Sequence, residues 1–221
     1  MRKLVVVSAG LSTPSSTRNL ADRLAQAAEA AVTARGEALK VTNIEVRDLV
    51  MDLATAMTAG GIGTPKLNEV KREISAADGM IAVTPVFSAS FSGVFKMFFD
   101  ALDTSALNGM PVLIGATAGT PRHSLVLEHA MRPLFTYLRA TVVPTSIFAA
   151  TEDFGGGAAA ELEPRITRAA GELASLIVAE TDAVGGLGGA TAHAMPRRNG
   201  VDLQQDGIPS FASLLRGHTG E

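Results

Sequence analysis

The chain has 221 residues, of which 47% are hydrophobic and 19% are charged, and its formal net charge is −3. This composition excludes a chain that is disordered throughout, and no apolar run approaches the ~18 consecutive residues of a membrane span. The small net charge and the single tyrosine argue against a nucleic-acid groove, which combines a basic face with stacking aromatic residues. The absence of cysteine excludes disulfide bonds, thiolate metal sites and a cysteine nucleophile. Because the first apolar run is too short for a signal peptide, we expect a cytoplasmic protein.

Short apolar runs alternate with stretches of helical periodicity from the first residues onward. The run at residues 4–7 is typical of a strand buried on both faces of a sheet. Apolar residues between Leu20 and Val32 then recur at helical spacing until Gly36, a C-cap candidate. The same patterns predict later strands near residues 41–46, 80–83, 111–116 and 141–150, and later helices near residues 67–74, 93–102, 125–138 and 162–176.

Five strands that alternate with helices predict a parallel sheet covered on both faces, which is a three-layer α/β/α sandwich. Pro133 lies inside a predicted helix and should kink it or split it near Arg132. From about Gly185 the composition becomes rich in glycine and indicates a linker. We therefore predict one domain at residues 1–180, followed by a linker and tail at residues 181–221.

Ligands of such sheets bind beyond the carboxyl ends of the strands, so the loops after the first, third and fourth strands are candidate sites. The first loop is rich in hydroxyl groups and leads into a helix, a combination that suits a phosphate group. It matches neither the P-loop nor the GxGxxG pattern, so a phosphate monoester fits better than a triphosphate. The alternative is that Ser16 or Thr17 only caps the helix.

The two other loops offer room for a flat ring. After the third strand, residues 84–90 present backbone polar groups and Phe87, while the helical spacing of Phe95, Phe98 and Phe99 indicates core positions. The small residues after the fourth strand allow a planar ligand to approach the backbone, and His123 beyond them is read as a surface residue.

The sequence contains no pair of residues that stands out as general acid and base, and no histidine pair has metal-ligand spacing with a third ligand. We therefore expect neither a metal site nor a catalytic side chain. A site with phosphate donors and room for a ring suits chemistry that is carried out by a bound cofactor, such as hydride transfer to a flavin.

Three segments of the chain together resemble the NAD(P)H-dependent FMN reductase family: SAGLSTPSSTRNLADRL, ISAADGMIAVTPVFSASFSGVFKMFFD and TAGTPRHSLVLEHAMRPLFTYL. The sequence is most similar to the FMN reductases of two-component monooxygenases, such as those of the alkanesulfonate systems. The likeness covers about residues 1–180, and SFASLLRG near the end resembles the tail of that branch. The resemblance implies a flavodoxin-like fold with strand order 2-1-3-4-5, FMN, NADPH or NADH as the reductant, a homodimer or homotetramer, and a flavin-dependent monooxygenase as a further partner.

The resemblance also implies roles for individual residues of this sequence. Those expected to hold the FMN phosphate are Ser12, Ser16, Thr17 and Arg18. Those expected to line the isoalloxazine ring are Pro85, Val86, Phe87 and Ser88 on one side and Thr117, Ala118 and Gly119 on the other. The family commonly has tyrosine at the position of Phe87, so one hydroxyl contact is missing here. In the alkanesulfonate branch an aromatic residue at the position of Phe91 makes a π-bulge, which makes Phe91 a candidate for the same feature.

Two other functions share the fold and the flavin. A flavodoxin-type electron carrier commonly buries its ring between aromatics and is strongly acidic, unlike this chain, which has no tryptophan and is nearly neutral. A quinone or azo-dye reductase with permanently bound FMN differs only in its electron acceptor. The sequence does not choose between NADPH and NADH, because Arg18, Arg122, Arg197 and Arg198 are all candidates for contact with a 2′-phosphate.

Overall fold

One twisted sheet organises the computed structural model, which describes residues 1–155 and 159–179. Its strands are β1 (Arg2–Ser8), β2 (Leu39–Glu45), β3 (Gly79–Phe87), β4 (Ser90–Phe91), β5 (Pro111–Ala118), β6 (Thr141–Val142) and β7 (Ile147–Ala150). They are ordered β2-β1-β3-β5-β6, β7 also pairs with β5, and all these pairs are parallel. Only β4 is antiparallel, as the second arm of a hairpin with β3. If β6 and β7 are counted as one interrupted strand, this is the predicted 2-1-3-4-5 order of a flavodoxin-like fold.

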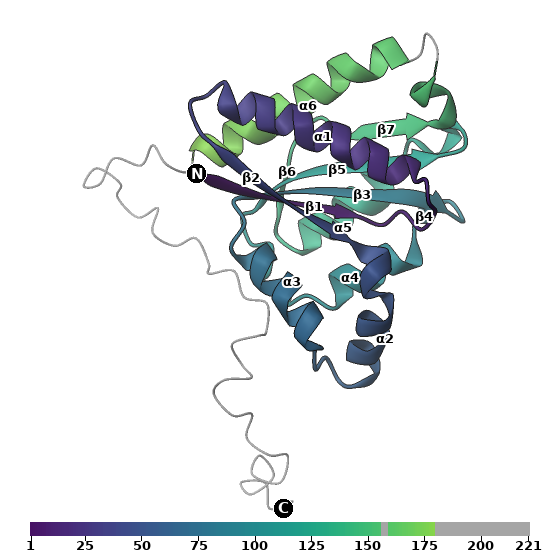
Figure 1. The fold of residues 1–221 in the computed structure, drawn as a ribbon. Coiled ribbons are helices and arrows are strands. Elements are labelled where there is room, and N and C mark those ends of the chain that lie inside the picture. Colours follow the sequence, from purple (N-terminus) through teal and green to yellow (C-terminus); the bar gives the residue numbers. More distant parts are fainter. Residues whose placement is uncertain (156–158, 180–221) are drawn as a thin grey trace, which may run out of the picture.

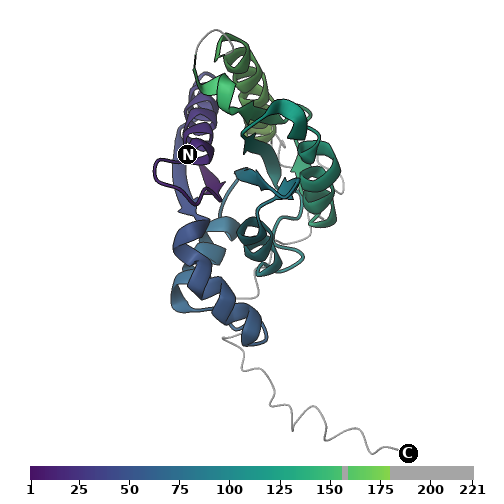
Figure 2. The same cartoon turned by 90° about the vertical axis from the view of Figure 1, so that its right-hand side faces the viewer.

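Helices cover both faces of the sheet and complete the predicted three layers (Figures 1 and 2). Helices α1 (Ser16–Thr33) and α6 (Ala159–Ala179) pack together on one face. The other face carries η1 (Val46–Leu49), α2 (Val50–Thr58), α3 (Pro65–Ser75), α4 (Gly93–Asp100), the π-helix η3 (Leu127–Met131) and α5 (Arg132–Tyr137). Two further short helices are η2 (Pro121–His123) and η4 (Thr151–Phe154). Among the described residues, no helix is both long and apolar enough to cross a membrane.

The sheet separates two apolar cores, because successive residues of a strand point to opposite faces. Leu4 and Val6 of β1 pack with α1 and α6, whereas Val5 and Val7 face the opposite helix layer. The predicted core positions Phe95, Phe98 and Phe99 are confirmed, since all three are buried. Together with Phe135 of α5 they form an aromatic cluster that joins α4 to α5, with ring centroids 4.8 Å apart for Phe95 and Phe99 and 4.9 Å apart for Phe99 and Phe135.

The predicted fifth strand is interrupted between Val142 and Ile147. Pro144 lies in this interval and cannot donate a ladder hydrogen bond. The next residue, Thr145, turns instead toward α6, where its N–H and its hydroxyl donate to the carboxylate of Glu172 at 2.8 and 2.7 Å. The strand therefore pairs with β5 in two pieces, and the interval is held to the helix layer above it.

The helix predicted over residues 125–138 changes type near its middle. A π-helical segment ends at Met131 and α5 begins at Arg132, so the change predicted near Arg132 is a change of helix type within a continuous helical stretch. No bulge forms at Phe91, the position that the resemblance suggested. Phe91 lies in β4, and α4 begins only at Gly93, where the Ser92 hydroxyl accepts a hydrogen bond from the amide of Phe95. The predicted linker and tail at residues 181–221 lie outside the described residues.

Glu128 of the π-helix predicts an acid-sensitive contribution to stability. Hydrogen bonds from Arg132 and Ser146 lower the pKa of its carboxyl below the ordinary 4.5. A carboxyl with a lowered folded-state pKa stabilises the protein above its unfolded-state pKa, and this contribution is lost as the pH falls through the folded-state pKa. We expect Glu128→Gln to lower the free energy of unfolding at pH 7, and the difference from wild type to shrink below pH ~4.5. Urea titrations between pH 7 and pH 3 measure this; a constant difference would contradict it.

Candidate functional site

Three loops meet at the carboxyl end of the sheet, where the strand order reverses between β1 and β3. They enclose a hollow of about 340 Å³, within the ~300–1,000 Å³ usual for small-molecule sites. Its lining consists of Gly10, Leu11, Ser12, Ser15, Ser16, Thr17, Pro85, Val86, Phe87, Thr117, Ala118, Gly119 and Thr151. These residues carry no charged side chain, and nine of them are predicted site residues. The other two predicted residues, Arg18 and Ser88, do not line the hollow.

One wall is the hydroxyl loop, residues 10–17, which leads from β1 into α1. Ser15 caps the helix by accepting a hydrogen bond from the amide of Arg18 at 3.2 Å. The loop does contain a helix cap, but the capping residue is Ser15 and not Ser16 or Thr17. The Thr17 hydroxyl is instead buried and lies 2.8 Å from the hydroxyl of Thr117 at the end of β5. This contact joins the hydroxyl loop to the opposite wall.

The donors at this wall fit a phosphate monoester. The first amides of a helix have no partner within the helix, and its dipole favours an anion there. The hydroxyl of Ser8, the last residue of β1, is buried just before the loop begins without lining the hollow, and no described group forms a hydrogen bond with it. The exposed side chains of Ser12 and Ser16 add further hydroxyl groups on the same loop. Neutral donors at a helix start are therefore ready for an anionic group, as FMN requires.

Gly10 allows the hydroxyl loop to fold this tightly. A Cβ atom at this position would lie 2.0 Å from the Ser15 hydroxyl oxygen and 3.2 Å from the Cβ atom of Thr17. Real Cβ atoms are not found so close to other atoms, so any side chain here would displace the cap of α1. The loop thus depends on a residue that the sequence analysis did not place in the site.

The second wall is the end of β3 and the hairpin that follows it. Thr84 and Ser92 are both fully buried, and the Thr84 hydroxyl accepts a hydrogen bond from the Ser92 amide at 3.1 Å and donates one to the Pro85 carbonyl at 2.9 Å. These bonds fix the backbone that leads to Phe87, whose side chain is 48% exposed. Ser88 occupies the turn beyond it with a φ of +48°, a conformation that is uncommon for a side-chain-bearing residue. The turn presents Phe87 at the hollow while Ser88 lies beyond it.

The third wall comes from the ends of β5 and β7. Pro85 of β3 pairs in register with Thr117 of β5, so the two predicted ring-lining segments lie on neighbouring strands. Ala118 and Gly119 continue this wall, and Thr151 adds a hydroxyl group from the start of η4. An exposed aromatic ring and a wall of small residues are a lining that suits a planar heterocycle, so the chemistry of the residues present fits FMN.

The guanidinium group of Arg18 is held by two carboxylates. It bonds Asp22, one turn further along α1, at 2.7 Å, and also Glu45 at the end of β2. The hydrogen bond that Arg18 donates to Glu45 is the main reason that the pKa of Arg18 is raised above its ordinary value. Direct contact of Arg18 with the phosphate therefore stays a prediction, and its described partners point to a role in holding α1 against β2. Arg122 and His123 lie exposed in η2 and do not line the hollow.

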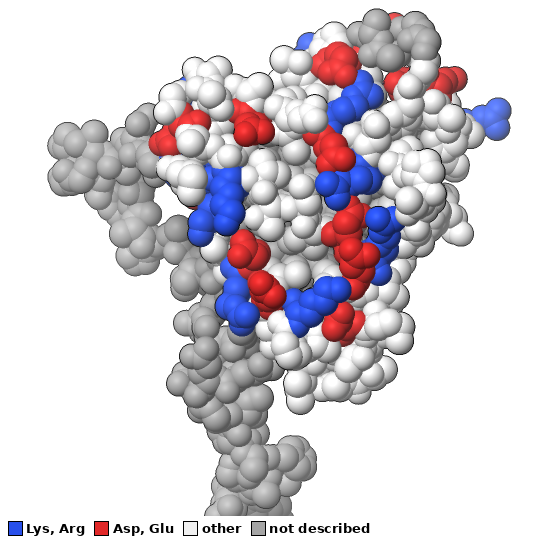
Figure 3. Space-filling model, in the orientation of Figure 1, with Lys and Arg blue, Asp and Glu red and all other residues white. Residues whose placement is uncertain are grey.

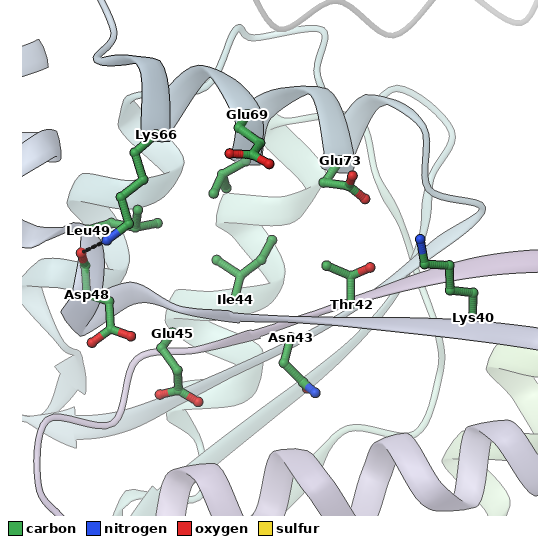
Figure 4. A pocket seen from close by; sticks show the side chains of 11 residues that line it. Lys40, Thr42, Asn43, Ile44, Glu45, Asp48, Leu49, Lys66, Glu69 and Glu73 are labelled. Atoms are coloured by element: carbon green, nitrogen blue, oxygen red, sulfur yellow. Dashed lines mark hydrogen bonds between the residues drawn. The ribbon is translucent and has the colours of Figure 1, made fainter.

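A second hollow, of about 390 Å³, lies between β2 and α3. Figure 4 shows Glu69 and Glu73 of α3 above Thr42 and Ile44 of β2, with Lys66 donating to the backbone oxygen of Asp48. It lies beside the edge strand rather than at the strand ends, and its carboxylates would repel a phosphate. The surrounding face alternates acidic and basic side chains without a large patch of one sign (Figure 3). The hollow at the strand ends is therefore the candidate site.

The chain also matches known proteins. Residues 2–155 match the family model described as NADPH-dependent FMN reductase. An FMN reductase (NADPH) of Pseudomonas aeruginosa is 36% identical over 154 residues, which cover 69% of this chain and 78% of that protein. The NADH-dependent FMN reductase SfnF of Pseudomonas putida is 31% identical over 156 residues, which cover 69% of this chain and 79% of that protein.

Two solved structures extend the likeness. An oxidoreductase from Corynebacterium diphtheriae is 62% identical, with a TM-score of 0.80, and the match covers 82% of this chain and 99% of that one. The apo form of the NADH:FMN oxidoreductase EmoB is 30% identical, with a TM-score of 0.61, over 77% of this chain and 89% of that one. The family model spans more than half of the chain and includes all three walls of the hollow. The chain belongs to the NADPH-dependent FMN reductase family.

Proposed function

We propose that this protein reduces FMN with NADPH or NADH and supplies the reduced flavin to a partner monooxygenase. The observation that supports the proposal best is the hollow at the switch point of the sheet, whose lining includes helix-start donors on one wall and an exposed aromatic ring on another. The family match and the names of the relatives support the reductase activity. The transfer to a monooxygenase rests on the resemblance to the alkanesulfonate branch alone.

The side chains have the task of binding and alignment. FMN would supply the redox chemistry when bound, as the acceptor of a hydride from NAD(P)H, which would be oxidised while solvent provides the accompanying proton. The hydroxyl loop would bind the phosphate, and Pro85–Phe87 and Thr117–Gly119 would hold the ring from two neighbouring strands. Since Phe87 is half exposed, one approach to the ring would remain open to the nicotinamide.

Assay of the purified protein tests the activity. Loss of the reduced-nicotinamide absorbance on mixing with FMN and either NADPH or NADH is expected, and the ratio of the two kcat/KM values identifies the preferred reductant. Absence of catalysed oxidation with both nucleotides would overturn the reductase and favour an electron carrier. FMN that stays bound through gel filtration would instead favour a reductase that passes electrons to quinones or azo dyes.

Ser16→Ala tests the phosphate site. Net hydrogen bonds to charged groups contribute about 1.5–3 kcal/mol, so we expect an FMN dissociation constant at least about tenfold higher, measured by quenching of flavin fluorescence. Ser16 is exposed and makes no capping bond, so the fold should not change. Thr33→Ala, at the exposed far end of the same helix, is the matched control and should leave the affinity unchanged.

Transfer to a partner is tested separately. A flavin-dependent monooxygenase that lacks its own reductase should turn over when this protein, FMN and NAD(P)H are added. Turnover without this protein, or none with it despite rapid FMN reduction, would contradict the transfer while leaving the reductase activity intact. The homodimer or homotetramer implied by the resemblance is part of the same proposal, and sedimentation equilibrium measures it.

A further inference from the structure

Arg47 reaches the hydroxyl loop from a distant part of the sequence. It lies in η1, the short helix that follows β2, and its Nη1 donates to the Ser12 carbonyl at 3.1 Å and to the Thr13 hydroxyl at 2.8 Å. Ser12 lines the candidate site. Arg47 itself does not line the hollow, so any effect on a ligand would pass through the loop.

These two hydrogen bonds tether residues 11–14, the part of the loop that precedes α1. Among the described residues, no other hydrogen bond joins residues 11–14 to another element. One further bond lies within this stretch, from the Ser12 hydroxyl to the Pro14 carbonyl at 2.8 Å. An untethered loop of this kind would lose its defined conformation, because each ordered residue costs about 1–2 kcal/mol of backbone entropy. The position of Ser12, one of the expected phosphate donors, therefore depends on a side chain outside the loop.

The base of the tether is rigid. Val46 and Leu49, on either side of Arg47 in η1, are buried in the core on the α2 and α3 side of the sheet. The Glu45 carboxylate lies between the two arginines, bonding Arg18 on one side and approaching Nε of Arg47 to 3.8 Å on the other. Its side chain is only 14% exposed, which limits screening by water. Glu45, at the end of β2, therefore links Arg47, which bonds the loop, with Arg18 in the first turn of α1.

We propose that Arg47 is a positioning residue for phosphate recognition: it fixes Ser12 and Thr13 so that the hydroxyl loop accepts the phosphate of FMN. This inference rests on the proposed function of the site. It predicts a specific failure when Arg47 is lost, because only the phosphate end of the ligand meets the loop. The ring walls at Pro85–Phe87 and Thr117–Gly119 belong to other strands and keep their own bonds.

Comparison of FMN with riboflavin, which has the same ring but no phosphate, tests the proposal. We expect Arg47→Ala to raise the dissociation constant of FMN about tenfold, as for the loss of one or two hydrogen bonds, and to change that of riboflavin by less than about twofold. Arg47→Lys keeps one donor and should recover part of the FMN affinity. Both constants are measured by fluorescence quenching, with circular dichroism to confirm the fold.

Arg35→Ala is the matched control. Arg35, just beyond the other end of α1, likewise donates to backbone carbonyls, those of Ala31 and Gly171, and to a hydroxyl, that of Ser175. Its loss should leave both affinities unchanged. Unaltered FMN binding by Arg47→Ala, or an equal loss for both flavins, would overturn the proposal; if Arg47→Ala does not fold, the same comparison made with Arg47→Lys decides. Failure of the wild-type protein to bind FMN would instead contradict the proposed function.

Discussion

Gly10→Ala is expected to weaken FMN binding by at least about tenfold, or ~1.4 kcal/mol, and to destabilise the start of α1. The added methyl group would lie 2.0 Å from the Ser15 hydroxyl oxygen, which caps the helix through the Arg18 amide. Displacement of a serine cap costs about 1 kcal/mol, and the same movement shifts the donors of the hydroxyl loop. Fluorescence quenching measures the affinity and thermal denaturation the stability.

Two further variants separate the clash from other effects of the substitution. The double variant Gly10→Ala with Ser15→Gly removes the colliding side chain, and glycine at a helix cap costs only a few tenths of a kcal/mol, so it should recover most of the lost stability. Gly93→Ala is the control, because a Cβ atom at this first residue of α4 would meet nothing within 4 Å. Normal FMN affinity of the Gly10→Ala protein would contradict the tight packing of the loop.

Phe95→Ala is expected to lower the free energy of unfolding by about 3–5 kcal/mol, a large part of the ~5–15 kcal/mol typical of a domain. Phe95 is fully buried and contacts the rings of Phe91, Phe99 and Phe135, so truncation leaves a cavity bordered by three aromatic side chains. Because these residues come from β4, α4 and α5, the cavity lies where three elements meet. Urea denaturation at neutral pH measures the loss.

Tyr137→Ala is the control for Phe95→Ala, because Tyr137 is an aromatic residue of α5, in the same helix layer. Its side chain is 72% exposed at the end of α5, so removal should change stability by no more than about 0.5 kcal/mol. A loss below about 1 kcal/mol for Phe95→Ala would show that the surrounding rings collapse into the space, and would contradict the rigid cluster inferred here.

The local pattern of the chain predicts most of the fold. The buried strands and the helices at residues 16–33, 65–75 and 159–179 have apolar spacing that only one type of element satisfies. The helix at Val50–Thr58 is not predicted, because only Leu53 and Ala56 of its residues are buried and so few positions give little periodicity. The fifth strand is predicted as one piece because the bonds from Thr145 to Glu172 join residues 27 apart in sequence.

The candidate site could likewise be predicted in part from the sequence. Nine predicted residues surround one hollow because parallel strands place the loops after their carboxyl ends at a single edge of the sheet, a consequence of topology that the sequence pattern already contains. The sequence pattern does not show which charged and hydroxyl groups bond to one another, because this depends on which elements become neighbours. Thr151 reaches the hollow from the end of β7, Arg18 turns to Glu45, and Arg47 bonds a loop about 34 residues earlier in the chain. The sequence by itself determined the fold class and the loops that form the site, because hydrophobic periodicity is a local property, whereas the strand order was implied by the family resemblance. Tertiary structure alone decided which side chains hold those loops in place, because hydrogen bonds and ion pairs form between whichever groups folding brings together.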